Sequence, residues 1–113
     1  MHELGIAQEM FQIALDYATK NNASRITQFN VAMSAAADER EDSLKFHFDH
    51  VTRGTLAEGA RVEITRIPIQ AKCLECGNDF EWTSETILCP CCSSARLRAL
   101  PHDEFKLTSI EVE

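Results

Sequence analysis

The stretch CLECGNDFEWTSETILCPCC, residues 73–92, contains all five cysteines of the 113-residue chain. Cys73 and Cys76 form one C-x2-C pair, and Cys89 and Cys92 form a second pair after an interval of twelve residues. Four thiolates that converge from two tight turns suit tetrahedral Zn(II), whose Zn–S distances are about 2.3 Å. The spacing therefore predicts a structural zinc site that folds this part of the chain.

Other identities of the cysteine cluster stay open at this point. Two such pairs also occur in rubredoxin-like sites, which bind one iron. A third alternative is redox activity, because an isolated C-x2-C pair can be redox-active. Cys91 is an alternative fourth ligand, although the two-residue spacer favours Cys92. Because a closed site of four thiolates leaves no position for a substrate, it is not expected to catalyse a reaction.

Charge and hydropathy exclude several classes of partner. Eighteen acidic residues against eleven basic ones give a net charge of −7, which disfavours binding to phosphate backbones. No apolar run approaches the roughly 20 residues of a membrane span. The first residues, MHELGIAQEM, carry an acidic residue where a secretory signal has a basic region. We therefore expect a cytoplasmic protein without nucleic-acid or membrane partners, in which reduced cysteines bind metal.

Periodicity along the rest of the chain predicts both helices and strands. Apolar residues between Leu4 and Lys20 recur every three or four positions, which indicates an amphipathic helix. Residues 25–33 (RITQFNVAM) alternate as in a strand. The segment 43–55 (SLKFHFDHVTRGT) fits either a strand or a helix. We favour a helix that is closed by Gly54 in the left-handed conformation.

Two further strands are predicted on either side of the cysteine segment. Residues 60–69 (ARVEITRIPI) and 104–113 (EFKLTSIEVE) each alternate and then change phase. In the first of them this predicts a β-bulge near Arg66. The cysteine segment, from about residue 71 to about residue 100, is thus an insertion between two strands that can pair with each other.

The N-terminus offers a second candidate metal site. Met1, His2 and Glu3 bring together a free amine, two backbone amides, an imidazole and a carboxylate. Nitrogen donors in a near-planar arrangement suit Ni(II) or Cu(II). A histidine at position 2 is more often a solvated terminal residue, and an acidic residue also suits the first turn of a helix. The triad alone leaves these interpretations open.

Several fragments along the chain carry more information together than each does alone. They are MHELGIAQEM (1–10), TRGTLAEGARVEI (52–64), CLECG (73–77), CPCC (89–92) and LTSIEVE (107–113). Together they resemble the HypA/HybF family of nickel metallochaperones for [NiFe]-hydrogenase maturation. The resemblance runs over nearly the whole chain in the same order.

The resemblance implies a fold and two sets of metal ligands. The implied class is α+β, with two helices on a three-stranded, mainly antiparallel sheet formed by residues 1–70 and 101–113. A zinc-ribbon-like domain, residues 71–100, is inserted before the last strand. Transient Ni(II) would bind the amine of Met1, the backbone amides of His2 and Glu3 and the His2 imidazole, with the Glu3 carboxylate nearby. Structural Zn(II) would bind Cys73, Cys76, Cys89 and Cys92.

The resemblance also implies the partners of the protein. They are a HypB-type GTPase, which exchanges nickel, and the hydrogenase large-subunit precursor, which receives it. Some family members also serve urease maturation, which adds urease accessory proteins. The chain departs from the family at residues 33–42 (MSAAADERED), where a glycine is usual after the first strand. We therefore expect the turn into the second helix to differ.

A function of another class is a zinc-ribbon binding module in a transcription or translation complex. Such a module needs a basic or aromatic face. Arg96 and Arg98 follow the last cysteine, but the residues around the two cysteine pairs are acidic. An enzyme is not expected either, because no nucleophile, base and orienting group can be assembled from this sequence.

Overall fold

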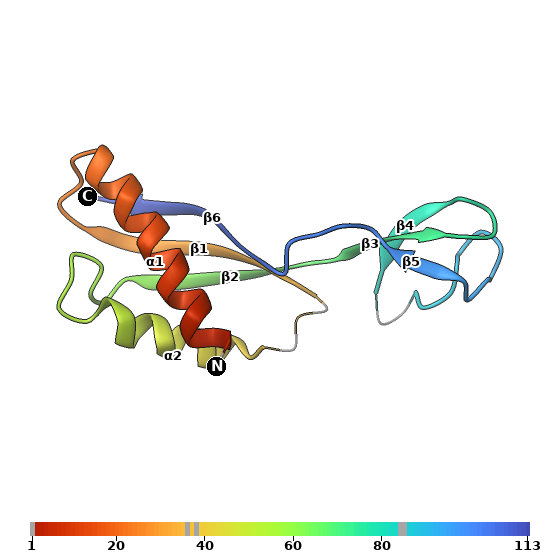
Figure 1. The fold of residues 1–113 in the computed structure, drawn as a ribbon, viewed down its shortest axis with the longest axis horizontal. Coiled ribbons are helices and arrows are strands. Elements are labelled where there is room, and N and C mark those ends of the chain that lie inside the picture. Colours follow the sequence, from red (N-terminus) through yellow and green to blue (C-terminus); the bar gives the residue numbers. More distant parts are fainter. Residues whose placement is uncertain (1, 36, 38, 84–85) are drawn as a thin grey trace. The chain divides into compact units, whose positions relative to one another are not determined.

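The computed structural model describes residues 2–35, 37, 39–83 and 86–113, without the side chain of His2. The chain divides into two compact units (Figure 1). The first unit comprises Met1–Ala32, Asp38–Thr65 and Phe105–Glu113, and the second comprises Met33–Ala37 and Arg66–Glu104. The cysteine segment thus belongs to a unit of its own.

The first unit consists of two helices packed on one three-stranded sheet. Its helices are α1 (His2–Lys20) and α2 (Glu41–Thr52). Its strands are β1 (Ile26–Ser34), β2 (Arg61–Ile67) and β6 (Phe105–Val112), in the order β2-β1-β6. Both helices cover the same face of the sheet in Figure 1, and one hydrophobic core joins α1, α2 and β1. The predicted α+β class, with a cysteine insert before the last strand, is confirmed.

Strand β6 runs antiparallel to the central strand β1. The backbone N–H of Ser34, at the end of β1, donates to the carbonyl of Glu104 at 2.8 Å. The N–H of Glu113 donates to the carbonyl of Arg25, just before β1, at 2.9 Å. The start of one strand therefore lies beside the end of the other.

Strand β2 runs parallel to β1, so the sheet is mixed. Ile26 donates to the carbonyl of Leu56 at 3.0 Å, and Ala35 donates to the carbonyl of Ile67 at 2.9 Å. A parallel pair needs a crossover connection, and α2 lies in the segment that joins β1 to β2.

The apolar periodicity of the two helices places their small and aromatic residues in the core. Ala7, Ala14 and Ala18 on α1 are at most 1% exposed, so this helix lies close to the sheet. The rings of Phe29 on β1 and Phe48 on α2 are in contact, with centroids 4.9 Å apart. The favoured helix at 43–55 is confirmed, and Gly54 follows it with a left-handed φ of 77°.

One local prediction is wrong. Residues 60–69 do not form a single strand with a bulge near Arg66; they contain the whole of β2 and the start of β3 (Ile69–Cys73), which belong to different sheets. The break falls at Pro68, whose missing N–H cannot continue a ladder. The change of phase therefore marks the passage from one sheet to the other.

The second unit has its own antiparallel sheet and a small core. Strands β4 (Asp79–Trp82) and β5 (Leu97–Ala99) flank β3 on either side. The buried cluster consists of Ala71, Cys73, Phe80 and Cys89, with Trp82 and Leu97 packed against it. So few apolar side chains supply little hydrophobic stabilisation, and small domains of this kind usually depend on a metal or disulfides.

The segment that lacks the expected glycine is only partly described. The Arg66 guanidinium donates to the carbonyls of Ser34 at 3.1 Å and Ala37 at 3.3 Å. Residues 36 and 38 lie outside the described residues, so an altered turn there stays a prediction. Within the described part of the chain, no helix has the length and apolar character needed to cross a membrane.

Truncation of Phe48 tests the importance of the aromatic contact between α2 and β1. We expect Phe48→Ala to lower the free energy of unfolding of the first unit by about 3–5 kcal/mol, because it leaves a cavity in the core. Phe46→Ala is the matched control, since Phe46 lies on the same helix and is 67% exposed; we expect a change within about 0.5 kcal/mol. Urea unfolding followed by far-UV circular dichroism measures both. Equal losses in the two variants would contradict this account of the core.

Candidate functional site

The first cysteine pair lies on a tight turn at the end of β3. The carbonyl of Cys73 accepts a hydrogen bond from the N–H of Gly77 at 2.9 Å, and the N–H of Cys73 donates to the carbonyl of Asn78 at 2.9 Å. Gly77 has a φ of 78°, a conformation that glycine adopts without a steric penalty. This turn directs the Cys73 and Cys76 thiols toward one point.

The second cysteine pair has the same hydrogen-bonding pattern. The carbonyl of Cys89 accepts from the N–H of Ser93 at 2.8 Å, and the N–H of Cys89 donates to the carbonyl of Ser94 at 3.0 Å. Ser93 takes the place of Gly77, with a φ of 62°. A non-glycine residue in this region stores backbone strain of about 1 kcal/mol or more, which the closure of the turn must offset.

The two turns bring four sulfur atoms together. The Sγ atoms of Cys73, Cys76, Cys89 and Cys92 all lie within 4.8 Å of one another. The Cys73–Cys92 separation is 3.5 Å and the Cys76–Cys89 separation is 3.6 Å. A tetrahedral ion with ligands at about 2.3 Å requires ligand–ligand separations of about 3.8 Å. The cluster therefore fits one tetrahedral metal ion without a large rearrangement.

Backbone N–H groups favour the thiolate form at the two buried cysteines. The N–H of Cys76 lowers the pKa of Cys73 below its usual value, against the opposing effect of desolvation. At Cys89 desolvation acts to raise the pKa, but the N–H groups of Cys92 and Cys91 outweigh it and lower the pKa to about 6. Each turn therefore supplies one sulfur that ionises readily.

The two exposed cysteines behave in the opposite way. At Cys76 the N–H of Asn78 acts to lower the pKa, but desolvation and the neighbouring sulfurs raise it to about 12. At Cys92 the N–H of Ser94 is likewise outweighed by the Cys73 sulfur and by desolvation, which raise the pKa. Full ionisation of all four sulfurs therefore needs a compensating cation, and binding of that cation releases protons.

Contacts around the turns connect the two halves of the sulfur cluster. The N–H of Leu74 donates to the carbonyl of Arg96 at 2.8 Å, and the Arg96 guanidinium pairs with the Glu75 carboxylate at 2.8 Å. Lys72 pairs with Asp79 at 3.1 Å across β3 and β4. Ion pairs this exposed contribute only about 0–1 kcal/mol each, so they orient the turns more than they stabilise them.

The N-terminal candidate site is described in part. Met1 and the side chain of His2 lie outside the described residues, whereas the half-buried Glu3 lies in the first turn of α1. The Glu3 carboxylate accepts a hydrogen bond from the hydroxyl of Ser43 at 3.1 Å. Ser43 lies in the first turn of α2, so this contact ties together the N-terminal ends of the two helices.

The structure thus brings together the four cysteines that the spacing indicated. Cys91 is exposed and is not one of the four. The assignments of zinc to these cysteines and of nickel to Met1, His2 and Glu3 stay predictions. Sequence reasoning missed Ser43 and Ser93. No local pattern links residue 43 to residue 3. Ser93 could have been found, because it follows Cys89 by four residues, as Gly77 follows Cys73.

Comparison with known proteins identifies similar chains over the full length. The family model HypA, described as hydrogenase/urease nickel incorporation metallochaperone, matches residues 1–112. Proteins named hydrogenase maturation factor HypA from Acidithiobacillus ferrooxidans and Azotobacter vinelandii are 34% and 36% identical over 113 residues. Hydrogenase maturation factor HybF from Klebsiella pneumoniae is 34% identical over 113 residues. Each of these alignments covers 100% of both chains.

Two solved structures share the fold. The solution structure of the Ni metallochaperone HypA from Helicobacter pylori superposes with a TM-score of 0.68 at 18% identity, and the match covers 97% of this chain and 96% of that one. A structure described as the solution structure of HypA protein gives a TM-score of 0.75 at 20% identity, with 100% and 97% covered. At 18% and 20% sequence identity, these matches show a shared fold only.

Serine substitution tests the role of the sulfur cluster. We expect Cys73→Ser to lower the affinity for Zn(II) by more than about 100-fold and to unfold the second unit, because a thiolate is lost from a closed site. Cys91→Ser is the matched control and is expected to bind metal like the unmodified protein. Chelator competition measures the affinity, and fluorescence of Trp82, the single tryptophan, follows the fold of the second unit. Unchanged metal content in Cys73→Ser would exclude this site.

Proposed function

The chain belongs to the HypA family of nickel metallochaperones for hydrogenase maturation, as its sequence fragments predicted, and we propose that it binds Ni(II) at its N-terminus and delivers it during [NiFe]-hydrogenase maturation. The observation that carries this proposal is that the family match extends from residue 1 to residue 112. It therefore includes both the N-terminal triad and the four cysteines.

The start of α1 supports the use of backbone nitrogens as nickel ligands. The helix begins at His2, and the first four N–H groups of an α-helix have no intrahelical partner. The amides of His2 and Glu3 can therefore be deprotonated without breaking a helical hydrogen bond. With the amine of Met1 and the imidazole of His2 they form a set of four nitrogen donors, the type of set that Ni(II) prefers.

The contact between Glu3 and Ser43 supports a positioning role for α2. A hydroxyl donor at 3.1 Å keeps the Glu3 carboxylate near the start of α1, where negative charge also interacts favourably with the helix dipole. The carboxylate would then lie beside the nickel donors. Because the nitrogen donors must lose protons before they bind, release of the ion to an acceptor is favoured as pH falls.

The sulfur cluster has a different role in this proposal. Zn(II) held by Cys73, Cys76, Cys89 and Cys92 would fold the second unit and stay in place, since all four positions around the ion are taken by protein. We assign the nickel-binding domain to residues 1–70 plus 101–113 and the zinc-binding domain to residues 71–100. The proposed setting is the cytoplasm. The proposed partners are a HypB-type GTPase, the hydrogenase large-subunit precursor and, for urease maturation, urease accessory proteins.

The alternative of a zinc-ribbon module for nucleic-acid complexes receives less support. Such a module would present basic residues beside the cysteine turns. Arg96 instead pairs with Glu75 at 2.8 Å, and Lys72 pairs with Asp79 at 3.1 Å. The net charge of −7 also opposes binding to phosphates.

Nickel titration of protein with a native N-terminus tests the proposal. We expect stoichiometric binding by the unmodified chain and a loss of affinity of at least about 100-fold in His2→Ala, or when residues are added before Met1, because the amine and imidazole donors are removed or displaced. His50→Ala is the matched control, since His50 is exposed on α2. Calorimetry measures the affinity and stoichiometry of Ni(II) binding, and the ligand-field absorption of Ni(II) reports its coordination. Equal binding by all of these proteins would refute N-terminal coordination.

Removal of the Ser43 hydroxyl tests the positioning of Glu3. We expect Ser43→Ala to weaken Ni(II) binding by about 2- to 10-fold and to cost about 1 kcal/mol of stability, the usual net value of one hydrogen bond. Ser24→Ala removes a hydroxyl that bonds the carbonyl of Glu113 and should leave Ni(II) affinity unchanged. Calorimetric titration of both variants decides the matter. An unchanged Ni(II) affinity in Ser43→Ala would show that the contact is structural only.

A further inference from the structure

The four cysteines of the sulfur cluster differ in their exposure to solvent. Cys73 and Cys89 are each 1% exposed, whereas Cys76 and Cys92 are exposed. Each turn thus supplies one buried cysteine and one cysteine that a small solute can reach. A closed site of four thiolates excludes substrates of the metal, but it does not exclude a reagent that reacts with the exposed sulfurs themselves.

Two sulfur–sulfur contacts pair the cysteines across the two turns. The Sγ atom of Cys73 lies 3.5 Å from that of Cys92, and the Sγ atom of Cys76 lies 3.6 Å from that of Cys89. Each contact joins a buried cysteine of one turn to an exposed cysteine of the other turn. Because the S–S bond of a disulfide is about 2.05 Å long, the sulfurs of each pair need to approach by only about 1.5 Å to form one.

Backbone contacts outside the sulfur cluster hold the two turns side by side. The N–H of Leu74, which lies between the cysteines of the first turn, donates to the carbonyl of Arg96 at 2.8 Å. In the ladder between β3 and β5, Cys73 lies opposite Leu97. These contacts fix the segment that follows the second turn beside the first turn, and they do not involve the sulfurs. The cross-turn pairs therefore stay within reach of each other when the cluster holds no ion.

We propose that the sulfur cluster is a site of reversible oxidation by hydrogen peroxide, which converts it into the disulfides Cys73–Cys92 and Cys76–Cys89 and releases the bound ion. The inference rests on the assignment of Zn(II) to the four cysteines in the proposed function, and it goes beyond that assignment by naming the chemistry that removes the ion. The second unit then has two cross-linked forms, one held by metal and the other by sulfur–sulfur bonds.

The reaction at each pair is a two-electron oxidation. Metal-bound cysteines are thiolates, so the exposed sulfurs of Cys76 and Cys92 can attack hydrogen peroxide. The S–O bond forms, the O–O bond breaks, and a sulfenic acid and a hydroxide ion result. The thiolate of the buried partner, Cys89 or Cys73, then attacks the oxidised sulfur; the S–S bond forms, the S–O bond breaks, and a second hydroxide ion leaves. Each pair therefore gives two electrons to one peroxide molecule.

Formation of the disulfides accounts for release of the ion. Zn(II) binds cysteine as the thiolate, and the sulfurs of a disulfide carry no negative charge. The first disulfide leaves two thiolates of the original four, so the affinity for the ion falls before the oxidation is complete. A thiol reductant reverses the reaction by exchange, which restores all four ligands.

Chain entropy favours disulfides across the turns over disulfides within them. Cys73 and Cys92 are 19 positions apart, and Cys76 and Cys89 are 13 positions apart. A cross-link that closes a longer loop removes more conformational entropy from the unfolded chain. A bond within one C-x2-C pair would close the turn alone and would leave the two turns unconnected. Because the buried cluster of the second unit is small, we expect the cross-turn bonds to keep this unit folded without metal.

Peroxide titration of the zinc-loaded full chain tests the proposal. We expect complete release of zinc with consumption of about two peroxide molecules per ion, and recovery of the bound ion after addition of dithiothreitol and Zn(II). A colorimetric chelator of low affinity measures the release. A chain purified without zinc would refute the zinc assignment and this proposal together. Retention of zinc in excess peroxide, or release that the reductant cannot reverse, would overturn the proposal alone.

Peptide mapping of the oxidised chain identifies the bonds. Cleavage after glutamate separates the first-turn cysteines from each other and from the second turn, because Glu75 and Glu81 lie between them. We expect both first-turn peptides to be linked to the second-turn peptide, and fragmentation in the mass spectrometer to locate the bonds at Cys92 and Cys89. Bonds within one turn, or bonds to Cys91, would overturn the proposal.

Cys91→Ser is the matched control, because it removes an exposed thiol outside the cluster. This variant should release zinc at the rate of the unmodified chain, and a slower release would overturn the proposal by showing that Cys91 reacts first.

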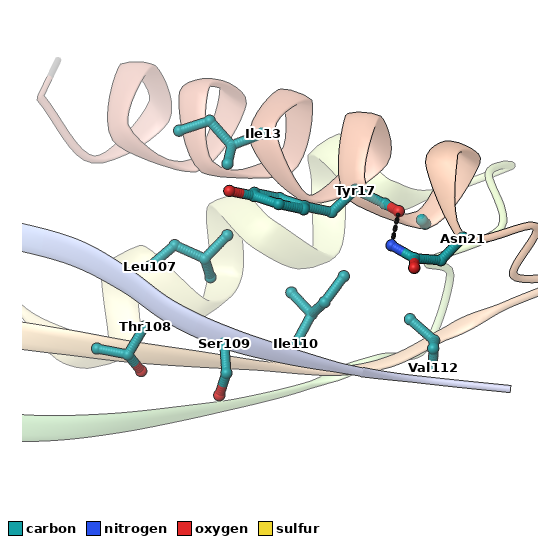
Figure 2. A pocket seen from close by; sticks show the side chains of 9 residues that line it. Ile13, Tyr17, Asn21, Leu107, Thr108, Ser109, Ile110 and Val112 are labelled. Atoms are coloured by element: carbon teal, nitrogen blue, oxygen red, sulfur yellow. Dashed lines mark hydrogen bonds between the residues drawn. The ribbon is translucent and has the colours of Figure 1, made fainter.

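The single tryptophan and the single tyrosine report on the two units separately. Trp82 packs against the buried cluster of the second unit. Tyr17 lies in the first unit, beside a groove that Leu107 and Ile110 of β6 also line (Figure 2). On oxidation the NMR ring signals of Trp82 should shift to new positions typical of a folded environment, and those of Tyr17 should stay in place. Collapse of the Trp82 signals to unfolded positions would refute the replacement of the metal by disulfides.

Discussion

The convergence of four sulfur atoms is the constraint on which the second unit depends. Among the described residues, its buried cluster consists of Ala71, Phe80 and two of the cysteines themselves, so the hydrophobic effect contributes little to holding its short strands together. Two turns with one hydrogen-bonding pattern place the sulfurs at separations suited to a single tetrahedral ion. A metal there would provide the cross-link that the missing core does not.

The two candidate metal sites differ in the groups that they use. The cysteine site is built from side chains on two turns whose backbones are fixed by hydrogen bonds, and its four sulfurs would fill all four positions around a tetrahedral ion. The proposed N-terminal site would rely mainly on main-chain nitrogens at the start of a helix, where the N–H groups have no intrahelical partners. Under the proposed function, the cysteine site would retain its ion and the N-terminal site would exchange its ion. A protein that transfers one metal ion and is folded by another needs both kinds of site.

Local pattern predicted most of the elements, and long-range contacts account for what it missed. Periodicity identified α1, α2, β1 and β6 and located β2, and cysteine spacing identified the sulfur cluster, because each of these signals lies within one short segment. The short strands of the cysteine unit were not predicted. The passage from β2 to β3 at Pro68 was misinterpreted because a change of phase in the apolar alternation fits both a β-bulge and a change of sheet, and the sequence does not show the pairing partner. The bond between Ser43 and Glu3, and the parallel pairing of β2 with β1, join residues distant in sequence, so no window of sequence contains them.

The position of the cysteine unit between β2 and β6 has a consequence for biosynthesis. The last strand of the first sheet leaves the ribosome after both cysteine turns, so the cage can close while that sheet is still incomplete. Once closed, the bond between the N–H of Leu100 and the carbonyl of Gln70 holds the two ends of the insertion together, at 2.8 Å. A flexible connection of some 35 residues then behaves as one of only a few, which lowers the entropy cost of docking β6 by about 1.5 kcal/mol. Metal binding to the cysteine turns would thus also favour completion of the first sheet.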